Sequence, residues 1–245
     1  WETETISDNL DNNQKSKKLT LKERYPEFNI INGELNGYNI NEYLRFIIDN
    51  YEDLPETVAF IKANTIGRHV SKKCFDKLIK NEYFTCIEEW EKHQINPSSF
   101  KSDYAMFSCD GGWMEKNTSW YLNHPKHPVK YFNNYDQFLR FCFNNPVIPK
   151  YIRFAPGGNY IVPKKQILKY EKTFYQNLKL FTSHSKMPGE AHMLERALYT
   201  LWNCNFEVAD TMKNPISFPI KEHKEFGFKK KTILEKAKSF IRKIK

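Results

Sequence analysis

The sequence predicts an α/β fold, a single domain in which a mixed sheet is flanked by helices. Short apolar runs of strand length alternate with segments whose apolar residues recur at helical spacing, an order typical of α/β proteins. The chain has 245 residues, of which 40% are hydrophobic, enough for one sizeable core but hardly for two. We therefore predict one α/β domain over residues 1–220, followed by a basic tail over residues 221–245.

The first third of the chain carries a turn, a helix and a strand. NGELNG at 32–37 predicts a turn, because Asn and Gly accept positive φ. Asn39 can then cap a helix whose apolar residues recur at helical spacing as far as Tyr51. ETVAFIKAN at 56–64 predicts a buried strand that ends in polar residues, and Ser71 predicts the cap of a short helix after it.

The rest of the chain alternates in the same way. DYAMFSC predicts a strand before the turn DGGW, and NHPKHPVKYF predicts an irregular loop, since its prolines exclude a helix. NYDQFLRFCF predicts a helix that begins near Asn134 or Asp136. YIRF and NYIVP predict strands joined by a Gly-Gly turn, and further helices are expected from near Pro163 and from Pro188.

The positive charge is concentrated in the tail. Residues 221–245 hold ten Lys and Arg and three Glu, a net charge of +7, so residues 1–220 carry +2 of the formal total of +9. The aromatic residues do not interleave with a basic stripe, as they do in proteins that bind single strands. We therefore expect no nucleic-acid partner.

The tail itself has the pattern of an amphipathic helix that binds an anionic membrane surface. In a helix that starts near Thr232, one face is apolar and the rest is basic; the apolar members are Ile233, Ala237, Phe240, Ile241 and Ile244. The alternative is that this helix docks on its own domain. No run approaches 18 apolar residues, and no signal peptide is evident. The five scattered cysteines form no CxxC pair, so a cytoplasmic protein, peripheral at the membrane, is predicted.

Three stretches in order carry a resemblance to a known family: ELNGYNINEYLRFIIDNYEDLPETVAFIKAN, APGGNYIVPKKQIL and PGEAHMLERAL. Together they resemble nucleotide-sugar glycosyltransferases of the GT-A fold, and more closely a glycosyltransferase-like branch of bacterial, viral and fungal proteins. That fold has an Asn-Gly turn before a helix, a strand ending in an Asp-x-Asp metal motif, and a Gly-Gly strand–helix unit before a Glu-Asp helix start. The resemblance spans about residues 20–205. It implies a GT-A-like sheet and transfer of a sugar from a nucleotide donor to a surface glycan acceptor, as in polysaccharide biosynthesis.

The sequence departs from that pattern in three places. Lys62, Ala63 and Asn64 stand where the family has its Asp-x-Asp motif, and a protonated lysine cannot ligate a metal. No cofactor is implied, and a Mn²⁺ or Mg²⁺ requirement is not expected. Glu190 is followed by Ala191 rather than by Asp. The first nucleotide-binding strand has no counterpart, so we expect residues upstream of Trp1.

Donor-binding residues are expected beyond the end of the strand at 56–64, where α/β proteins bind ligands. Asn64, Arg68 and His69 follow this strand, and the Arg68 guanidinium can hold a diphosphate through two hydrogen bonds. The resemblance places Asn36 and Gly37 near the nucleotide. The alternative for Arg68 is an ordinary loop arginine.

Acceptor-binding residues are expected at the turn DGGW. Asp110 stands at a strand end, where it can contact an acceptor sugar, and Trp113 offers a flat apolar face. The alternative for Asp110 is a turn aspartate. His124 and His127 have a spacing that can ligate a metal, but structural or surface histidines are favoured there.

The helix from Pro188 carries the candidate catalytic base. Leu194 and its apolar neighbours form a buried stripe, and Glu190 falls on the same side, where its carboxylate can take the proton of an acceptor hydroxyl. The alternative is that Glu190 caps its own first turn at the surface. Glu195 is the second candidate base, whereas His192 and Arg196 are predicted to point to the surface. The alternative function is a non-catalytic carbohydrate-binding or scaffold module on the same fold, which Lys62 favours.

Overall fold

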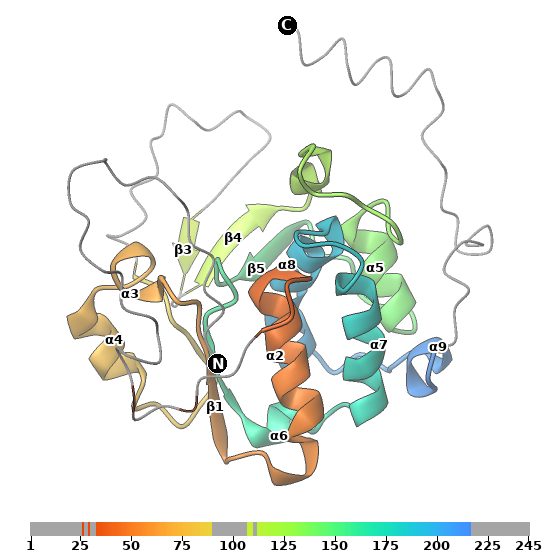
Figure 1. The fold of residues 1–245 in the computed structure, drawn as a ribbon. Coiled ribbons are helices and arrows are strands. Elements are labelled where there is room, and N and C mark those ends of the chain that lie inside the picture. The colour runs from red at the N-terminus through yellow and green to blue at the C-terminus, as the bar shows by residue number, and fades with distance from the viewer. Residues whose placement is uncertain (1–25, 27–28, 30–32, 90–106, 110–111, 217–245) are drawn as a thin grey trace, which may run out of the picture.

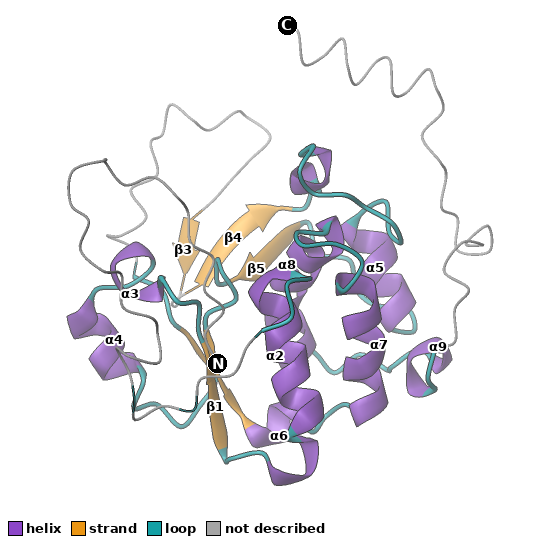
Figure 2. Ribbon diagram, in the orientation of Figure 1, coloured by secondary structure: helices purple, strands orange, loops and turns teal. Residues whose placement is uncertain are grey.

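The computed structural model describes residues 26, 29, 33–89, 107–109 and 112–216. It is a mixed α/β structure in which two small sheets lie beside a group of helices packed around α8 (Gly189–Asn203) (Figures 1 and 2). The basic tail and Asp110 lie outside the described residues. Within the described ranges, no helix combines the length and the apolar character that a bilayer-spanning segment requires.

Each sheet has three strands, and every pairing between these named strands is antiparallel. The first sheet has the order β1-β6-β2, formed by β1 (Thr57–Phe60), β6 (Tyr160–Pro163) and β2 (Thr85–Cys86). The second has the order β3-β4-β5, formed by β3 (Phe107–Cys109), β4 (Gly112–Lys116) and β5 (Tyr151–Phe154). The α/β class is confirmed, but the predicted mixed sheet is wrong for these strands. β1 is an edge strand with alternating burial rather than a fully buried strand.

The Gly157–Gly158 turn carries the chain from one sheet to the other. The two strands that it joins, β5 and β6, were predicted correctly, but they pair with different partners. Both glycines have positive φ, 82° and 72°, which favours Gly over other residues. A Cβ on Gly158 would lie 3.0 Å from Ile40 Cδ1, so the turn is packed tightly against α2 (Tyr38–Asp49).

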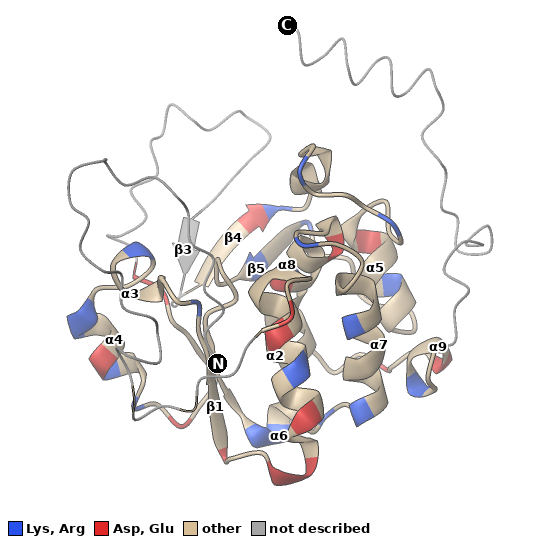
Figure 3. Cartoon of the chain, in the orientation of Figure 1, with Lys and Arg blue, Asp and Glu red and all other residues tan. Residues whose placement is uncertain are grey.

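The helices gather around α8, which contacts β5 and several helices on its different sides. The other helical elements are η1 (Tyr51–Asp53), α3 (Thr65–Arg68), α4 (Lys72–Leu78), η4 (Trp120–Asn123), α5 (Tyr135–Cys142), α6 (Lys164–Ile167), α7 (Lys172–Thr182) and α9 (Asp210–Lys213). Charges of both signs are interspersed on α2, α4 and α9 (Figure 3).

Two predicted helix caps are confirmed and one is wrong. Ser71 Oγ accepts a hydrogen bond from Cys74 N–H in α4, and Asn134 Oδ1 accepts one from Gln137 N–H in α5. Asn39 does not cap α2, because it lies inside the first turn and Gly37, with φ 69°, occupies the cap position. The side chain of Asn39 is instead used at the candidate site.

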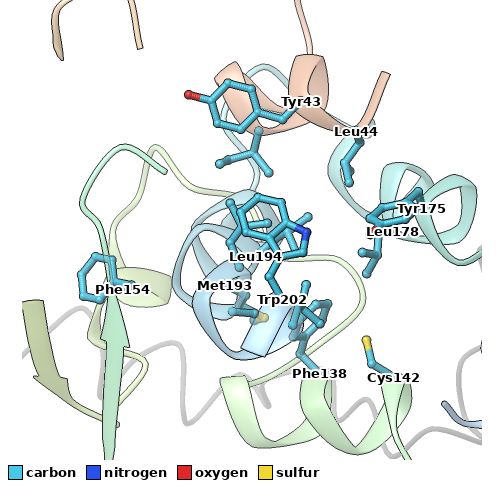
Figure 4. Packing of buried hydrophobic residues seen from close by; sticks show 14 of the residues in the cluster. Tyr43, Leu44, Phe138, Cys142, Phe154, Tyr175, Leu178, Met193, Leu194 and Trp202 are labelled. Carbon is cyan, nitrogen blue, oxygen red and sulfur yellow. The ribbon is translucent and has the colours of Figure 1, made fainter. Parts of the chain in front are cut away.

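The core is rich in aromatic residues and centres on the inner faces of α8. Trp202 stacks on Phe60 with their ring centroids 5.6 Å apart. Figure 4 shows Met193, Leu194 and Trp202 of α8 among side chains from α2, α5 and α7. The predicted buried stripe of α8 is confirmed, but burial also extends around the helix to Glu195 and Arg196.

Candidate functional site

Two polar side chains from different helices bind the Gly157 backbone. Asn39 Nδ2 donates a hydrogen bond to the Gly157 carbonyl at 2.8 Å, and the Gly157 N–H donates to Glu195 Oε1 at 2.8 Å. Both backbone polar groups of this residue are therefore held by side chains, one from α2 and one from α8. The turn is fixed between the two helices.

The end of β1 is tied to the same turn by Asn159. The side chain of Asn159 is fully buried, and its Oδ1 accepts hydrogen bonds from the Lys62 N–H at 2.9 Å and the Thr65 hydroxyl at 2.7 Å. Its Nδ2 donates to the Pro156 carbonyl at 2.9 Å. This buried amide fixes the strand end, from which the Lys62 side chain extends.

Lys62 brings a positive charge beside α2. Its Nζ lies 2.5 Å from the Tyr38 hydroxyl and 4.1 Å from the centroid of the Tyr38 ring. A Cβ built on Gly157 would lie 3.5 Å from Lys62 Cδ and 3.4 Å from His69 Nε2. The lysine stem and the imidazole therefore both border the glycine turn.

The predicted donor-binding residues after β1 do not share one environment. Asn64 and Arg68 are exposed, whereas His69 is 3% exposed and its Nδ1 lies 3.4 Å from Oε1 of the buried Glu88. His69 is therefore a buried neighbour of the glycine turn. Arg68 lies on the surface of the short helix α3.

The two predicted nucleotide-contacting residues before α2 also separate. Asn36 is exposed, but Gly37 is buried and its N–H donates to the Ser185 carbonyl at 2.9 Å. A Cβ on Gly37 would lie 2.5 Å from Asn41 Cβ and 2.6 Å from the Thr182 carbonyl oxygen. A side chain at position 37 would collide with the end of α7, which explains why this residue is glycine.

Glu190 is completely buried, so its alternative role as a surface cap is wrong. One carboxylate oxygen accepts hydrogen bonds from the N–H groups of Lys130 and Tyr131 at 2.7 and 2.6 Å. The other oxygen lies 2.8 Å from His184 Nε2. Glu190 therefore links the loop before α5 to the start of α8, and both of its oxygens already have protein partners.

Glu195 faces the glycine turn and His192. Its Oε2 lies 3.8 Å from His192 Nδ1, one turn earlier on α8. Burial raises the pKa of Glu195, but His192, the charge of Arg196 and the Gly157 N–H outweigh this effect and lower the pKa to about 2. The carboxylate is therefore ionised at neutral pH.

Three histidines form a stack that leads inward from the surface. His124 is exposed, its ring centroid lies 4.4 Å from that of His127, and the His127 centroid lies 4.0 Å from that of His192. Burial, together with the neighbouring His192, lowers the pKa of His127. Surface or structural histidines were predicted at 124 and 127, and His192 was predicted to point away. The structure instead directs the His192 ring toward the loop.

The predicted surface position of Arg196 is wrong. It is 6% exposed, and its guanidinium pairs with the buried carboxylate of Glu115 in β4 at 3.0 and 3.2 Å. Burial lowers the pKa of Arg196, but the charges of Glu115 and Glu195 outweigh this, so the pKa is raised. The guanidinium carbon also lies 4.0 Å from the Tyr121 ring centroid.

The predicted acceptor contacts receive little support from the structure. Asp110 lies outside the described residues. Trp113 is 6% exposed and belongs to the core, so its ring does not present the open flat face that was predicted. The reason is that the Trp113 side chain, in β4, packs into the hydrophobic core and does not face solvent.

Sequence reasoning missed the roles of Tyr38, Lys62, His192 and Glu115. Lys62 was recognised as a departure from the metal motif, but its contact with Tyr38 has no local signal. Across the part of the chain that the structure describes, no group of three or more His, Cys, Asp or Glu is arranged to hold a metal ion.

These features define a mixed α/β domain with a buried polar centre at the junction of two antiparallel sheets and helix α8. The chain belongs to the family described as "Protein of unknown function (DUF3431)", which its residues 27–217 match. In comparisons with curated proteins and with solved structures, nothing matches. The match names no activity and no glycosyltransferase family, so the predicted transfer reaction stays a prediction.

Proposed function

We propose that this protein is a glycosyltransferase that moves a sugar from a nucleotide donor to a surface glycan, without a bound metal ion. One observation supports this above the others. The three stretches that resemble such enzymes meet at Gly157, whose N–H and carbonyl are bound by Glu195 and Asn39. Residues far apart in the sequence thereby form one polar centre.

Lys62 is the group that we expect to contact the donor diphosphate. It extends from the end of β1, where the resembling enzymes hold a metal ion, and it is half-buried beside Tyr38. A fixed ammonium can stabilise the charge that develops on a leaving diphosphate. The exposed Arg68 would provide a second cation.

Of the two glutamates of α8 that the sequence indicated, we expect Glu195 to lie closer to a bound substrate. Both oxygens of Glu190 bind backbone N–H groups or His184, and none of its surface is exposed. Glu195 binds the glycine turn through one oxygen and has 11% of its side chain exposed. A substrate at the turn would therefore approach Glu195 first.

A transfer assay with uridine, guanosine and cytidine nucleotide sugars, read by mass spectrometry, tests this function. We expect turnover of at least one donor in EDTA as well as in Mn²⁺. Lys62→Met should weaken donor binding by roughly tenfold or more. The control Lys72→Met, an exposed lysine paired with Asp76, should bind donor like the wild type. Complete loss of turnover in EDTA with rescue by Mn²⁺ would contradict the metal-free proposal.

The second candidate is a carbohydrate-binding or scaffold module. The observation that favours it is the engagement of both Glu190 oxygens by the protein itself. The same assay separates the two functions, because a binding module would bind glycan in calorimetry and turn over no donor. An intact donor in every reaction, together with glycan binding, would select this candidate.

A further inference from the structure

We propose that His192 and Glu195 form a histidine–carboxylate pair in which His192 takes the proton of the acceptor hydroxyl. This inference rests on the proposed transferase function and identifies the base within the same site. It assigns Glu195 the role of orienting and charge-balancing His192. Glu195 itself is then not the proton acceptor.

The pair is built by the helix and the glycine turn together. His192 and Glu195 are three residues apart on α8 and so lie on one side of it, with Nδ1 and Oε2 3.8 Å apart. The Gly157 N–H donates a hydrogen bond to the other oxygen of Glu195 at 2.8 Å, which fixes the carboxylate beside the imidazole. Catalytic contacts are often long in the absence of substrate and shorten when it binds.

His192 is also the member of the pair that reaches farther toward solvent. Its side chain is 18% exposed, against 11% for Glu195. The His127 ring lies at 4.0 Å and the Tyr38 ring at 6.4 Å from it, centroid to centroid. Because Tyr38 also contacts Lys62, the imidazole and the donor-side cation border the same tyrosine.

The reaction balances with these groups. With Nδ1 directed at the carboxylate, Nε2 of a neutral His192 takes the proton as the acceptor O–H bond breaks. The oxygen forms a bond to the anomeric carbon, and the bond from that carbon to the donor phosphate breaks with its electron pair leaving on the phosphate. The nucleotide departs near Lys62, and ionised Glu195 stabilises the imidazolium that results.

Charged and titratable groups face His192 from several elements. The groups that face or neighbour the ring are Tyr38 from α2, Tyr121 from η4, His127 from the loop, Glu195 and Arg196 from α8, and Lys62 beyond Tyr38.

The pH profile of kcat/KM for the wild-type protein is the first test. If His192 is the base, kcat/KM falls on the acid side in the range where imidazoles take up protons, between about pH 5 and 8. If Glu195 were the base, its pKa of about 2 would keep kcat/KM level down to much lower pH. A profile that stays level to about pH 4 therefore overturns the proposal.

Variants provide the second test. His192→Gln and His192→Asn should each lower kcat by roughly 10² to 10⁴, remove the acid limb, and regain part of their rate with added imidazole. Glu195→Gln should lower kcat less than the His192 variants do, because the proposed base itself remains. His124→Gln, an exposed member of the same stack, is the matched control and should behave like the wild type.

Two outcomes distinguish a failure of the His192 proposal from a failure of the transferase function on which it rests. If the wild type turns over a donor and both folded His192 variants keep their rate and acid limb, the histidine is not the base while the transferase proposal survives. If the wild type turns over no donor, the transferase proposal fails and this inference fails with it. Circular dichroism and melting temperature establish that the variants are folded, and the wild-type pH profile decides the question if they are not.

Discussion

Arg196 and Glu115 form a two-point ion pair inside the protein, with Nε and one terminal nitrogen of the arginine 3.0 and 3.2 Å from the two carboxylate oxygens. The residues are 81 positions apart in the sequence. They link α8 to β4. The pair therefore joins the second sheet to the helix that carries the candidate base.

Removing one partner of this pair should destabilise the fold strongly. Glu115→Gln or Arg196→Met leaves the other buried charge without its hydrogen-bonded partner, which costs on the order of 3 to 5 kcal/mol. The double variant should recover part of that loss, because neither member of the pair is then left charged. Urea denaturation of the wild type, both single variants and the double variant measures these differences. A single-variant cost below about 1 kcal/mol would contradict the buried pair.

The lowered pKa of Glu195 should make its contribution to stability depend on pH. The carboxyl pKa falls from its ordinary 4.5 to about 2 on folding. Its contribution is therefore complete above about pH 4.5 and is lost as pH falls toward 2. The stability difference between the wild type and Glu195→Gln should shrink by about 2 kcal/mol between about pH 6 and pH 3. Urea titrations at both pH values measure it, and an unchanged difference would show that Glu195 is not held ionised.

Local features of the fold could be predicted from the sequence because their causes are local. Ser71 and Asn134 cap helices three residues before the N–H groups that they bind. The Gly157–Gly158 turn follows from two residues that accept positive φ. The turn does not indicate which strands pair with β5 and β6, so the sequence did not assign these two strands to different sheets.

The site could be predicted only where one segment carried the signal. Glu190 was identified as an inward carboxylate from the period of α8, Glu195 was the second candidate base on the same helix, and both are buried. Arg196 was assigned to the surface because an amphipathic helix was assumed to have a single buried face. Its partner in β4 and the contact of Asn39 with Gly157, 118 residues away, depend on tertiary packing that no local pattern records.

The tail at 221–245 should bind anionic membranes. Its sequence places apolar residues on one face of a helix and basic residues on the rest, and each basic residue near such a surface contributes about 1 kcal/mol at low salt. Co-sedimentation with vesicles containing phosphatidylserine should capture the full chain and release it in high salt. Phe240→Ser combined with Ile241→Ser should weaken capture while leaving the charge unchanged. Capture that survives deletion of residues 229–245 would assign membrane binding to another surface.

Variants at Glu190 test whether its carboxylate has a structural or a catalytic role. Its oxygens hold the N–H groups of Lys130 and Tyr131 and the ring of His184. Glu190→Ala should therefore cost about 2 to 4 kcal/mol, since it leaves buried N–H groups without an acceptor. Glu190→Gln should cost about 1 kcal/mol, because its amide oxygen can still accept from both N–H groups. Hydrogen exchange at Lys130 and Tyr131, measured by NMR, should rise strongly in the alanine variant and slightly in the glutamine variant.

Activity of the same glutamine variant completes that test. A base at position 190 requires turnover to fall by roughly 10² to 10⁴ in Glu190→Gln with little change in melting temperature. A structural carboxylate requires the reverse, a lower melting temperature with turnover nearly retained. The contacts of both Glu190 oxygens lead us to expect the second result. A large loss of turnover in a variant whose melting temperature and loop exchange match the wild type would return the role of base to Glu190.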